Sequence, residues 1–552
     1  MIVSKLNYNK MKNNQFIIIL IFTILMSCEN TMHVGDIHTS LESINEFEIQ
    51  GTVSSLFFEK EKPIGFFLQD SRWKNFTAQY FHSSERIEIG DKIKLKTRKV
   101  EKENSESFFE VVKLSKISSN HTIQYKKVSF PLTENDLRQL LGSYVEIQNE
   151  MVVCNAYNYL KYGILEVSTD PMIQLTEEYD AQNEKDKILS LDRSQKMNTI
   201  TLDDYSDSKY PESLYLEPSQ LKLGKNVLSI RGLISEYNGK LRLRVSEVLT
   251  QDQSSKHIFR DMKSGLIMMG FNVHNLFNGD GLGNGFPTQR GAENIEQYRR
   301  QILKLKMTIE KVNPDIIALM EIENDDFDSL SSLQQFCNFL NENSSRNYLI
   351  CQSDQSPGSD QIKTALIYDS TFVKVSKRGI YYPDSLFSRS PLFQEFSYTD
   401  SLQFVVSVNH FKSKNPRDAM GLNSDQNDGQ SAYNFKRIQQ ARKLLLIVDS
   451  FYQDIPLLVL GDFNAYTQED PIQEISSSLD RLKTSAFSYL YKGRLGNLDH
   501  AFVNKQMSPF VKSIQSWDIN ASSPHWLDYK NDGSEHSYLR SSDHNPLIIH
   551  LY

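Results

Sequence analysis

The stretch "LVLGDFNAY", residues 458–466, joins an apolar run to a pair of polar side chains, and this junction decides the local fold. The run 455–460 suits a strand that is covered on both faces. Gly461 frees the backbone at its end, and Asp462 and Asn464, two residues apart, point the same way in an extended chain. A carboxylate beside a donating amide suits a phosphate and its attacking water. A simple turn, which Asp and Asn also favour, is the alternative.

The bulk composition is that of a multidomain globular chain. Its 552 residues are too many for one core, so about two to four domains are expected. With 39% hydrophobic and 24% charged residues, the chain is not mainly disordered. A formal net charge of −8 excludes nucleic-acid binding by bulk electrostatics. Any such binding therefore requires a local basic patch or bound cations.

The N-terminus reads as a secretory signal peptide over residues 1–27. Three lysines precede the apolar segment 16–26, which is too short for a normal transmembrane helix. The following "LMSC" resembles the lipobox of bacterial lipoproteins, so we expect lipidation of Cys28 and a tether over 28–44. Cleavage takes the formal net charge from −8 to −11. The chain is then an exported lipoprotein of the cell envelope, at the outer membrane or cell surface; a plain signal with a chance cysteine is the alternative.

Three further cysteines, Cys154, Cys337 and Cys351, are too few for a disulfide scaffold or a zinc cluster. Pairing of Cys337 with Cys351 in an oxidising compartment stays open.

Two all-β segments follow the tether, at residues 45–125 and 126–255. Short strands such as "FEIQGTVSSLFFE" and "IGDKIKLKTRKV" alternate with glycine-containing turns in the first, and the second ends in a Tyr-Asn-Gly hairpin. Both resemble OB-fold barrels, the second with a polar insertion near 179–208. They would bind single-stranded nucleic acid or sugar, or serve only as spacers or packing modules.

The predicted secondary structure changes in the last segment, residues 262–552. Strands and helices alternate there, as in an α/β or α+β domain. "LIMMGFNVHNLF" and "PDIIALMEIEN" read as buried strands, and residues 290–312 read as a helix with apolar residues three or four apart.

Several strands of this segment end in polar residues, which suggests one site at a rim of strands. Oxygen ligands with few thiols and few histidines suit Mg²⁺ or Mn²⁺ better than zinc. Carboxylates, amides and two histidines suit phosphoryl chemistry. The residues at these ends are Asn272, Asn275, Glu321, Asn409, His410, Asp462, Asn464, Asp499, Asp543 and His544.

In this order, "FNVHN", "ALMEIEN", "VVSVNHFKSK", "VLGDFNAY", "GNLDHAF" and "RSSDHNP" resemble the motifs of the endonuclease/exonuclease/phosphatase superfamily, the DNase I-like proteins. Runs such as "RGAENIEQYRRQ" and "NDGQSAYNFKRIQQA" resemble bacterial extracellular nucleases that carry N-terminal OB-like domains. The resemblance implies a multidomain chain in which all-β OB-like barrels precede an α/β four-layer sandwich, two mixed β-sheets between helices.

The resemblance also implies a metal site and its cofactor. Glu321 would be the principal metal ligand, helped by Asn272 and Asp543. Mg²⁺ is the expected ion, with Mn²⁺ or Ca²⁺ as alternatives. His274 is either an added ligand or a wall residue.

The catalytic roles are carried over by motif in the same way. Asp462 would orient or deprotonate the attacking water, and Asn464 would bind the scissile phosphate. His544 would pair with Asp499, which fixes the imidazole tautomer, and would act as base or phosphate stabiliser. His410 would hold or protonate the phosphate opposite it.

Four further residues are expected to bind substrate: Asn275, Asn409, Lys412 and Arg437. The planar fork of Arg437 suits either a phosphate or a buried carboxylate. Other basic residues of these motifs contact the nucleic-acid backbone or lie on solvated faces; they are Arg290, Arg299, Arg300, Lys414 and Lys436.

The leading hypothesis is a secreted, lipid-anchored, monomeric, Mg²⁺-dependent endonuclease that hydrolyses phosphodiester bonds of DNA; whether it also cleaves RNA stays open. The first alternative keeps the site and changes the substrate to a phospholipid or sugar phosphate. The second is a nucleic-acid-binding surface protein with an inactive nuclease module, although a competent residue fills each catalytic position.

Overall fold

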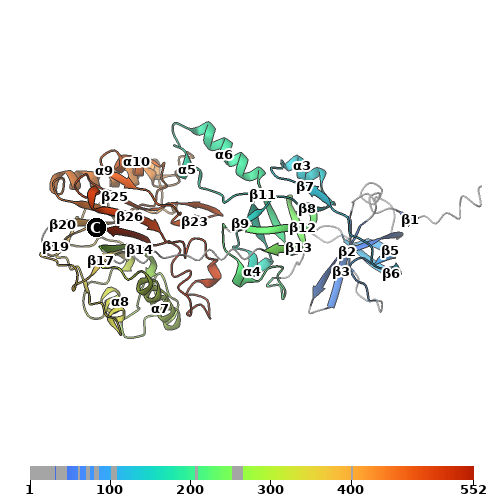
Figure 1. Ribbon diagram of the computed structural model, residues 1–552, viewed down its shortest axis with the longest axis horizontal. Coiled ribbons are helices and arrows are strands. Elements are labelled where there is room, and N and C mark those ends of the chain that lie inside the picture. The colour runs from blue at the N-terminus through green and yellow to red at the C-terminus, as the bar shows by residue number, and fades with distance from the viewer. Residues whose placement is uncertain are drawn as a thin grey trace, which may run out of the picture.

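The structure is a computed structural model, in which three β-rich parts follow one another along the long axis (Figure 1). Among the helices of the described residues, none is both long and apolar enough to cross a membrane. The signal peptide and Cys28 lie outside the described residues, and so does most of the tether. The described residues are 31–32, 46–59, 62–69, 75–79, 86–100, 108–204, 209–224, 226–250, 265–399 and 402–552.

The first part is a sheet that closes on itself. Its pairing runs β2-β3-β4-β6-β5 and returns from β5 to β2, and the two-residue β1 adds to β2. Ile49, Val53, Phe66, Ile93 and Leu95 lie buried inside it. A β-rich N-terminal region is therefore present, and its OB-like character stays a prediction. The strands are β1 (Thr31–Met32), β2 (Phe47–Glu59), β3 (Lys62–Gln69), β4 (Asn75–Gln79), β5 (Lys92–Val100) and β6 (Phe108–Ser118).

The second part is a seven-stranded sheet of order β13-β11-β10-β9-β12-β8-β7, with β12 also paired to β13. The expected insertion at 179–208 is more structured than its polarity suggested, because it contains a helix and a strand of this sheet. Ile200 and Leu202 are buried and alternate with threonines, a short pattern that the polar flanks conceal. The elements are β7 (Lys126–Val128), α3 (Glu134–Gln139), β8 (Tyr144–Ile147), β9 (Met151–Asn155), α4 (Tyr159–Tyr162), β10 (Leu165–Ser168), α5 (Leu175–Glu178), α6 (Lys185–Met197), β11 (Thr199–Asp203), η2 (Pro218–Gln220), β12 (Asn226–Tyr237) and β13 (Lys240–Thr250).

The third part contains two six-stranded mixed sheets and a hairpin. One sheet has the order β16-β17-β15-β14-β27-β26, and the other has the order β18-β19-β20-β21-β25-β22. Both strands expected from the sequence form, at Leu266–Leu276 and Ile316–Glu323. The strands are β14 (Leu266–Leu276), β15 (Ile316–Glu323), β16 (Tyr348–Ile350), β17 (Ile362–Asp369), β18 (Ile380–Tyr381), β19 (Leu392–Thr399), β20 (Leu402–His410), β21 (Leu457–Asp462), β22 (Asp480–Leu482), β23 (Tyr489–Tyr491), β24 (Arg494–Gly496), β25 (Asp499–Val503), β26 (Val511–Ser516) and β27 (Leu547–Leu551).

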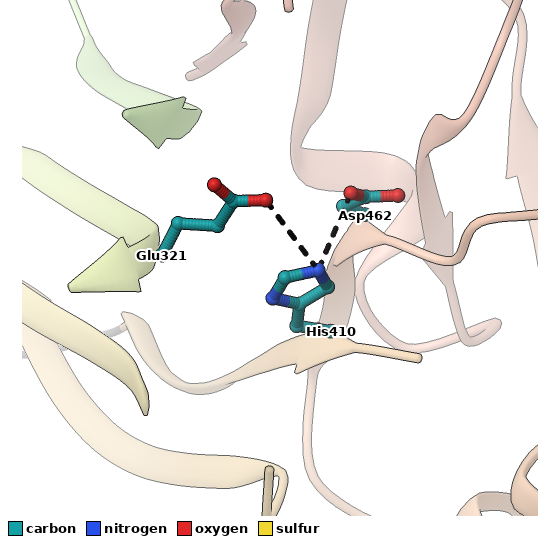
Figure 2. Close-up of side chains that lie close together, drawn as sticks. All are labelled: Glu321, His410 and Asp462. Atoms are coloured by element: carbon teal, nitrogen blue, oxygen red, sulfur yellow. Dashed lines mark ion pairs between the residues drawn. The ribbon is translucent and has the colours of Figure 1, made fainter. Parts of the chain in front are cut away.

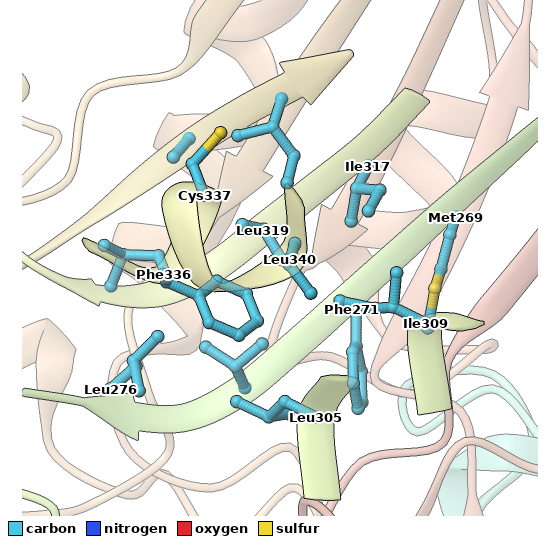
Figure 3. Close-up of a cluster of buried hydrophobic side chains, with 14 of the residues drawn as sticks. Met269, Phe271, Leu276, Leu305, Ile309, Ile317, Leu319, Phe336, Cys337 and Leu340 are labelled. Atoms are coloured by element: carbon cyan, nitrogen blue, oxygen red, sulfur yellow. The ribbon is translucent and has the colours of Figure 1, made fainter. Parts of the chain in front are cut away.

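Three apolar cores hold this part together. One lies between the first sheet and helices α7 and α8, where Phe271 and Leu319 meet Leu305 and Phe336 (Figure 3). A second lies between the two sheets, and a third packs the other sheet against helices α9 and α10. The helices are α7 (Ile295–Val312), α8 (Ser332–Asn341), η3 (Gly421–Asn423), α9 (Asn434–Phe451), α10 (Asp470–Ser476), η4 (Ser508–Phe510) and η5 (His525–Leu527).

Helix α7 begins five residues later than the sequence pattern indicated. Asn294 caps it, because its side chain accepts a hydrogen bond from the backbone N–H of Gln297 at 2.9 Å. Residues 290–294 therefore approach the helix as a turn. Elsewhere in this part, Cys337 and Cys351 are buried free thiols, so no disulfide joins them.

The second part contacts the third beside the hairpin β23–β24. The backbone N–H of Leu495 donates to Met172 O, and that of Gln174 donates to Leu495 O, both at 2.8 Å. Arg494 of the hairpin also pairs with Asp192 of α6 at 2.6 Å. The segment 172–174 therefore continues the hairpin, as an added strand would.

Candidate active site

Three strand ends from the two sheets bring their side chains to one point. Glu321 lies two residues before the end of β15, whereas His410 ends β20 and Asp462 ends β21, and the three side chains converge (Figure 2). His410 Nε2 lies 3.5 Å from Asp462 Oδ2 and 4.0 Å from Glu321 Oε1. The packing of the two sheets thus assembles a site from residues that are far apart in sequence.

Asn272 of β14 connects two of these carboxylates. Its fully buried amide donates to Glu321 Oε1 and to Asp462 Oδ2, each at 3.1 Å. Its Oδ1 accepts from the backbone N–H of His274 at 3.0 Å, which fixes the amide orientation. Ser542 Oγ donates to the backbone carbonyl of Asn272 at 2.7 Å, and this bond holds the loop that contains Asp543 against β14.

The backbone at the site takes left-handed conformations that side chains rarely adopt. Glu321, Asn275 and Asn464 have φ values of 67°, 57° and 49°. Gly461 has a φ of 147°, and a Cβ there would lie 2.0 Å from the backbone oxygen of Asn409. Only glycine therefore lets β21 approach β20 this closely while directing Asp462 into the site.

His544 is held by a buried carboxylate and a tyrosine ring. Its Nδ1 lies 2.7 Å from Asp499 Oδ2, and its Nε2 lies 3.9 Å from Asp462 Oδ2. The ring of Tyr489 lies 4.5 Å from the imidazole, between centroids. Burial lowers the pKa of His544, but the charges of Asp499, Asp543 and Asp462 outweigh it and raise the pKa well above its usual value.

The pKa values of the two titratable groups beside Glu321 shift in opposite directions. Burial raises the pKa of Asp462 to about 7, and the charges of Asp499 and Glu321 add to this, although His544 opposes it. Burial and the positive charges of Arg389, His544 and Arg290 lower the pKa of His410 well below its usual value. The surroundings therefore favour the neutral form of His410 and the protonated form of His544.

The donor set fits a hard divalent cation. Glu321, His410 and Asp462 each offer one ligand atom, and these atoms lie within 4.8 Å of one another. Glu321 Oε2 is buried and has no hydrogen-bond partner within the described residues. A bound cation would give this oxygen the partner that buried polar atoms normally have. Carboxylate oxygens beside one imidazole are ligands that Mg²⁺ or Mn²⁺ accepts.

The residues expected to bind substrate differ in accessibility. Lys412 is half-buried, with its ammonium 4.5 Å from the centre of the Tyr433 ring. Asn409 is buried and donates to Ser407 Oγ at 3.0 Å, on the side of β20 opposite to His410. Asn275 is half-buried, and its backbone oxygen faces the amide of Gln301.

The position of Arg437 does not support the expected substrate contact. It is fully buried, and its guanidinium donates to the backbone carbonyls of Gln430, Ala432 and Lys412 at 2.8, 2.8 and 3.3 Å. Its planar guanidinium therefore joins the backbone of residues 430–432 to that of Lys412 in the interior of the domain.

Sequence reasoning missed Arg389, which precedes β19. It is buried, and its Nη2 donates to Phe411 O at 2.5 Å. The amide of Asn464 donates to the same carbonyl oxygen at 3.1 Å. Arg389 stands in a loop without a polar strand-end motif, so only the fold could bring it here.

A family model described as Endonuclease/Exonuclease/phosphatase family matches residues 269–544, half of the chain. The chain belongs to this family. The matched segment contains Glu321, His410 and Asp462, together with the pair of His544 and Asp499. The superfamily inferred from the motifs is confirmed, and with it an enzyme of the hydrolase class.

No curated protein matches the chain. Similar solved structures include a family member from Bacteroides vulgatus, 15% identical, with 52% of this chain and 99% of that chain covered and a TM-score of 0.34. A mannosyl-6-phosphatase from Bacteroides thetaiotaomicron is 13% identical, with 52% and 99% covered and a TM-score of 0.33. D. rerio TDP2 complexed with single-strand DNA product is 14% identical, with 52% and 99% covered and a TM-score of 0.34. At these values the likenesses do not distinguish between substrates.

Proposed function

We propose that this family member is a divalent-metal-dependent nuclease that hydrolyses phosphodiester bonds of DNA, and of RNA as a second substrate. The observation that carries the proposal is the buried carboxylate of Asp462, which lies within 4 Å of both His410 and His544 and is hydrogen-bonded to Asn272. A carboxylate with a raised pKa between two imidazoles is suited to take a proton from water near neutral pH.

Asp462 is the general base in this proposal, and Asn464 positions the phosphate. Asp462 Oδ1 accepts the backbone N–H of Asn464 at 2.8 Å, so the two side chains are held in a fixed relation. Asp462 Oδ2 faces both histidines and is the oxygen that would receive the proton. A water held there would attack the phosphorus opposite the leaving oxygen.

His544 serves as a charged donor rather than as a base. With its pKa raised, it stays protonated on Nε2 and would donate to a phosphate oxygen as negative charge develops. Asp499 fixes its orientation through Nδ1. Neutral His410 completes the wall opposite it and carries no charge that would repel a cation.

Glu321 would hold the cation, with His410 and Asp462 beside it and with Asn272 orienting the carboxylates of Glu321 and Asp462. Asp543, in the loop that Ser542 holds against β14, would assist as a further ligand. Once bound, a divalent cation stabilises developing negative charge on the phosphate. Burial raises the pKa of Asp543, but the charges of His274, His544 and Arg540 outweigh it and keep the pKa below its usual value, so Asp543 stays ionised.

The test is cleavage of closed circular plasmid and of single-stranded RNA in Mg²⁺ and in EDTA. Asp462→Asn and His544→Gln are expected to lower the rate at least ~100-fold. Asp449→Asn, which changes an exposed carboxylate on α9, is the matched control and should leave the rate unchanged. If the wild-type protein left both polymers intact in Mg²⁺ and Mn²⁺, the nuclease proposal would fail in favour of a phospholipid or sugar phosphate.

The same proposal includes export, the lipid anchor at Cys28, the monomeric state and the OB-like character of the two β-rich parts. So does the four-layer arrangement of the catalytic part, which its three apolar cores support. An exported nuclease held at the cell surface would degrade extracellular DNA. Radiolabelled palmitate incorporation that is lost in Cys28→Ser would test the anchor.

A further inference from the structure

A group of four positive side chains lies beside the site, and two of them share one carboxylate. Arg290 Nη2 lies 3.1 Å and Arg389 Nη1 lies 3.9 Å from the carboxylate of Asp360. Lys412 follows Phe411, whose carbonyl oxygen accepts from Arg389, and Arg437, the neighbour of Lys436 on α9, donates to Lys412 O at 3.3 Å. Both lysines therefore belong to segments that contact the Arg389 segment. Asp360 is thus the one carboxylate that pairs with both arginines, while Asp462 and Glu321 of the adjacent site act on Arg389 from further away.

Arg389 is poorly compensated for a buried charge. Only 6% of its surface is exposed, its Nε has no hydrogen-bond partner among the described residues, and its nearest carboxylate is shared with Arg290. Arg346, which is also largely buried, shows the compensated case, because it pairs with Asp315 at 2.5 Å and Asp369 at 3.0 Å. A buried guanidinium without a close carboxylate costs stability unless another anion completes it.

The group adjoins the position proposed for the scissile phosphate. Phe411 O accepts from both Arg389 and Asn464, so one carbonyl oxygen links the two side chains. Lys436 stands in the first turn of α9, where the partial positive charge of the helix end adds to its own. An anion bound here would lie next to the phosphate held by Asn464.

We propose that Arg389, Arg290, Lys412 and Lys436 form a second phosphate site, which takes the neighbouring phosphate of the same polynucleotide strand. The proposal rests on the proposed function and specifies its substrate class: compounds with a phosphate next to the cleaved linkage. Arginine and lysine side chains bind phosphate oxygens with charge-assisted hydrogen bonds. A substrate with one isolated phosphodiester leaves this site empty and is bound more weakly.

The test compares thymidylyl-thymidine, which has one phosphodiester, with the same compound carrying a 5′- or 3′-terminal phosphate. Binding of labelled compounds to the full chain is measured in EDTA, where cleavage stops and the cationic group remains. Cleavage is measured separately in Mg²⁺. The wild-type protein is expected to bind one phosphorylated compound about tenfold more tightly than the unphosphorylated one.

Arg389→Gln and Lys436→Gln should each reduce this ratio of affinities to near one. Lys436 is half-buried on a helix surface, so its variant keeps the test valid if the Arg389 variant does not fold. Lys443→Gln is the matched control, because Lys443 lies two turns along α9 and pairs with Asp384 at 3.1 Å. A wild-type ratio near one, or a ratio unchanged in Lys436→Gln, would overturn the second phosphate site. Absence of cleavage with the binding preference intact would instead overturn the proposed nuclease activity.

Discussion

The imidazole of His544 lies between carboxylates that come from three different segments of the chain. Asp499 contacts its Nδ1 at 2.7 Å, and Asp462 lies 3.9 Å from its Nε2, with Asp543 next to it in sequence. These negative charges outweigh the effect of burial and favour the imidazolium. Because the pKa is raised, the protonated form persists as pH rises past the usual range of histidine and is lost only above the raised value.

Asp499→Asn should therefore move the alkaline limb of the pH dependence of kcat/KM to lower pH. The amide removes the nearest charge that raises the pKa of His544, so the imidazolium is lost at lower pH, and the rate falls roughly 100-fold. Rates across pH 5–10 at saturating Mg²⁺ measure both effects. Asp480→Asn, at an exposed carboxylate of β22, should keep the wild-type profile. An unshifted alkaline limb in Asp499→Asn would show that His544 does not act as the protonated donor.

At the scale of the element, the end of β21 depends on one glycine. In Gly461→Ala the Cβ would meet the backbone oxygen of Asn409 at 2.0 Å at a φ of 147°, so β20 and β21 must separate. We expect the free energy of unfolding to fall by roughly 3 kcal/mol, with lower kcat because Asp462 shifts. Gly533→Ala is the control: its φ is 80°, but nothing lies within 4 Å of the added Cβ, so ~1 kcal/mol is expected. Equal losses in urea unfolding would contradict the steric argument.

Elements with a strong local pattern could be predicted from sequence, and elements defined by distant packing could not. The strand Leu457–Asp462 follows from its apolar run and the glycine at its end. The start of α7 could not be predicted, because it depends on the capping contact of Asn294. Strand β11 could not be predicted either, because only two of its residues alternate as buried apolar positions. Among site residues, a strand-end motif located Asp462, whereas Arg389 sits in a loop that only tertiary packing brings to Phe411.

At the scale of the whole molecule, the second β-rich part inserts a buried carboxylate behind the active site. Glu177 of α5 is 9% exposed and accepts four hydrogen bonds from two residues of the catalytic part. Its donors are the backbone N–H and hydroxyl of Thr467, at 3.2 and 2.6 Å, and the backbone N–H and amide of Asn497, at 2.9 and 2.8 Å. Thr467 follows Asn464 by three residues and Asn497 precedes Asp499 by two, so this contact supports both catalytic loops.

Glu177→Ala should therefore weaken catalysis from outside the catalytic part. Four buried donors lose their acceptor, which should cost roughly 3 kcal/mol in the free energy of unfolding and lower kcat about tenfold. KM should change less, because no substrate contact is removed. Glu178→Ala changes the neighbouring exposed carboxylate and should leave stability and kcat unchanged. If Glu177→Ala lowered stability but left kcat at the wild-type value, the second part would be a packing module only. A fall in kcat at temperatures where the variant is fully folded would instead make it part of the catalytic unit.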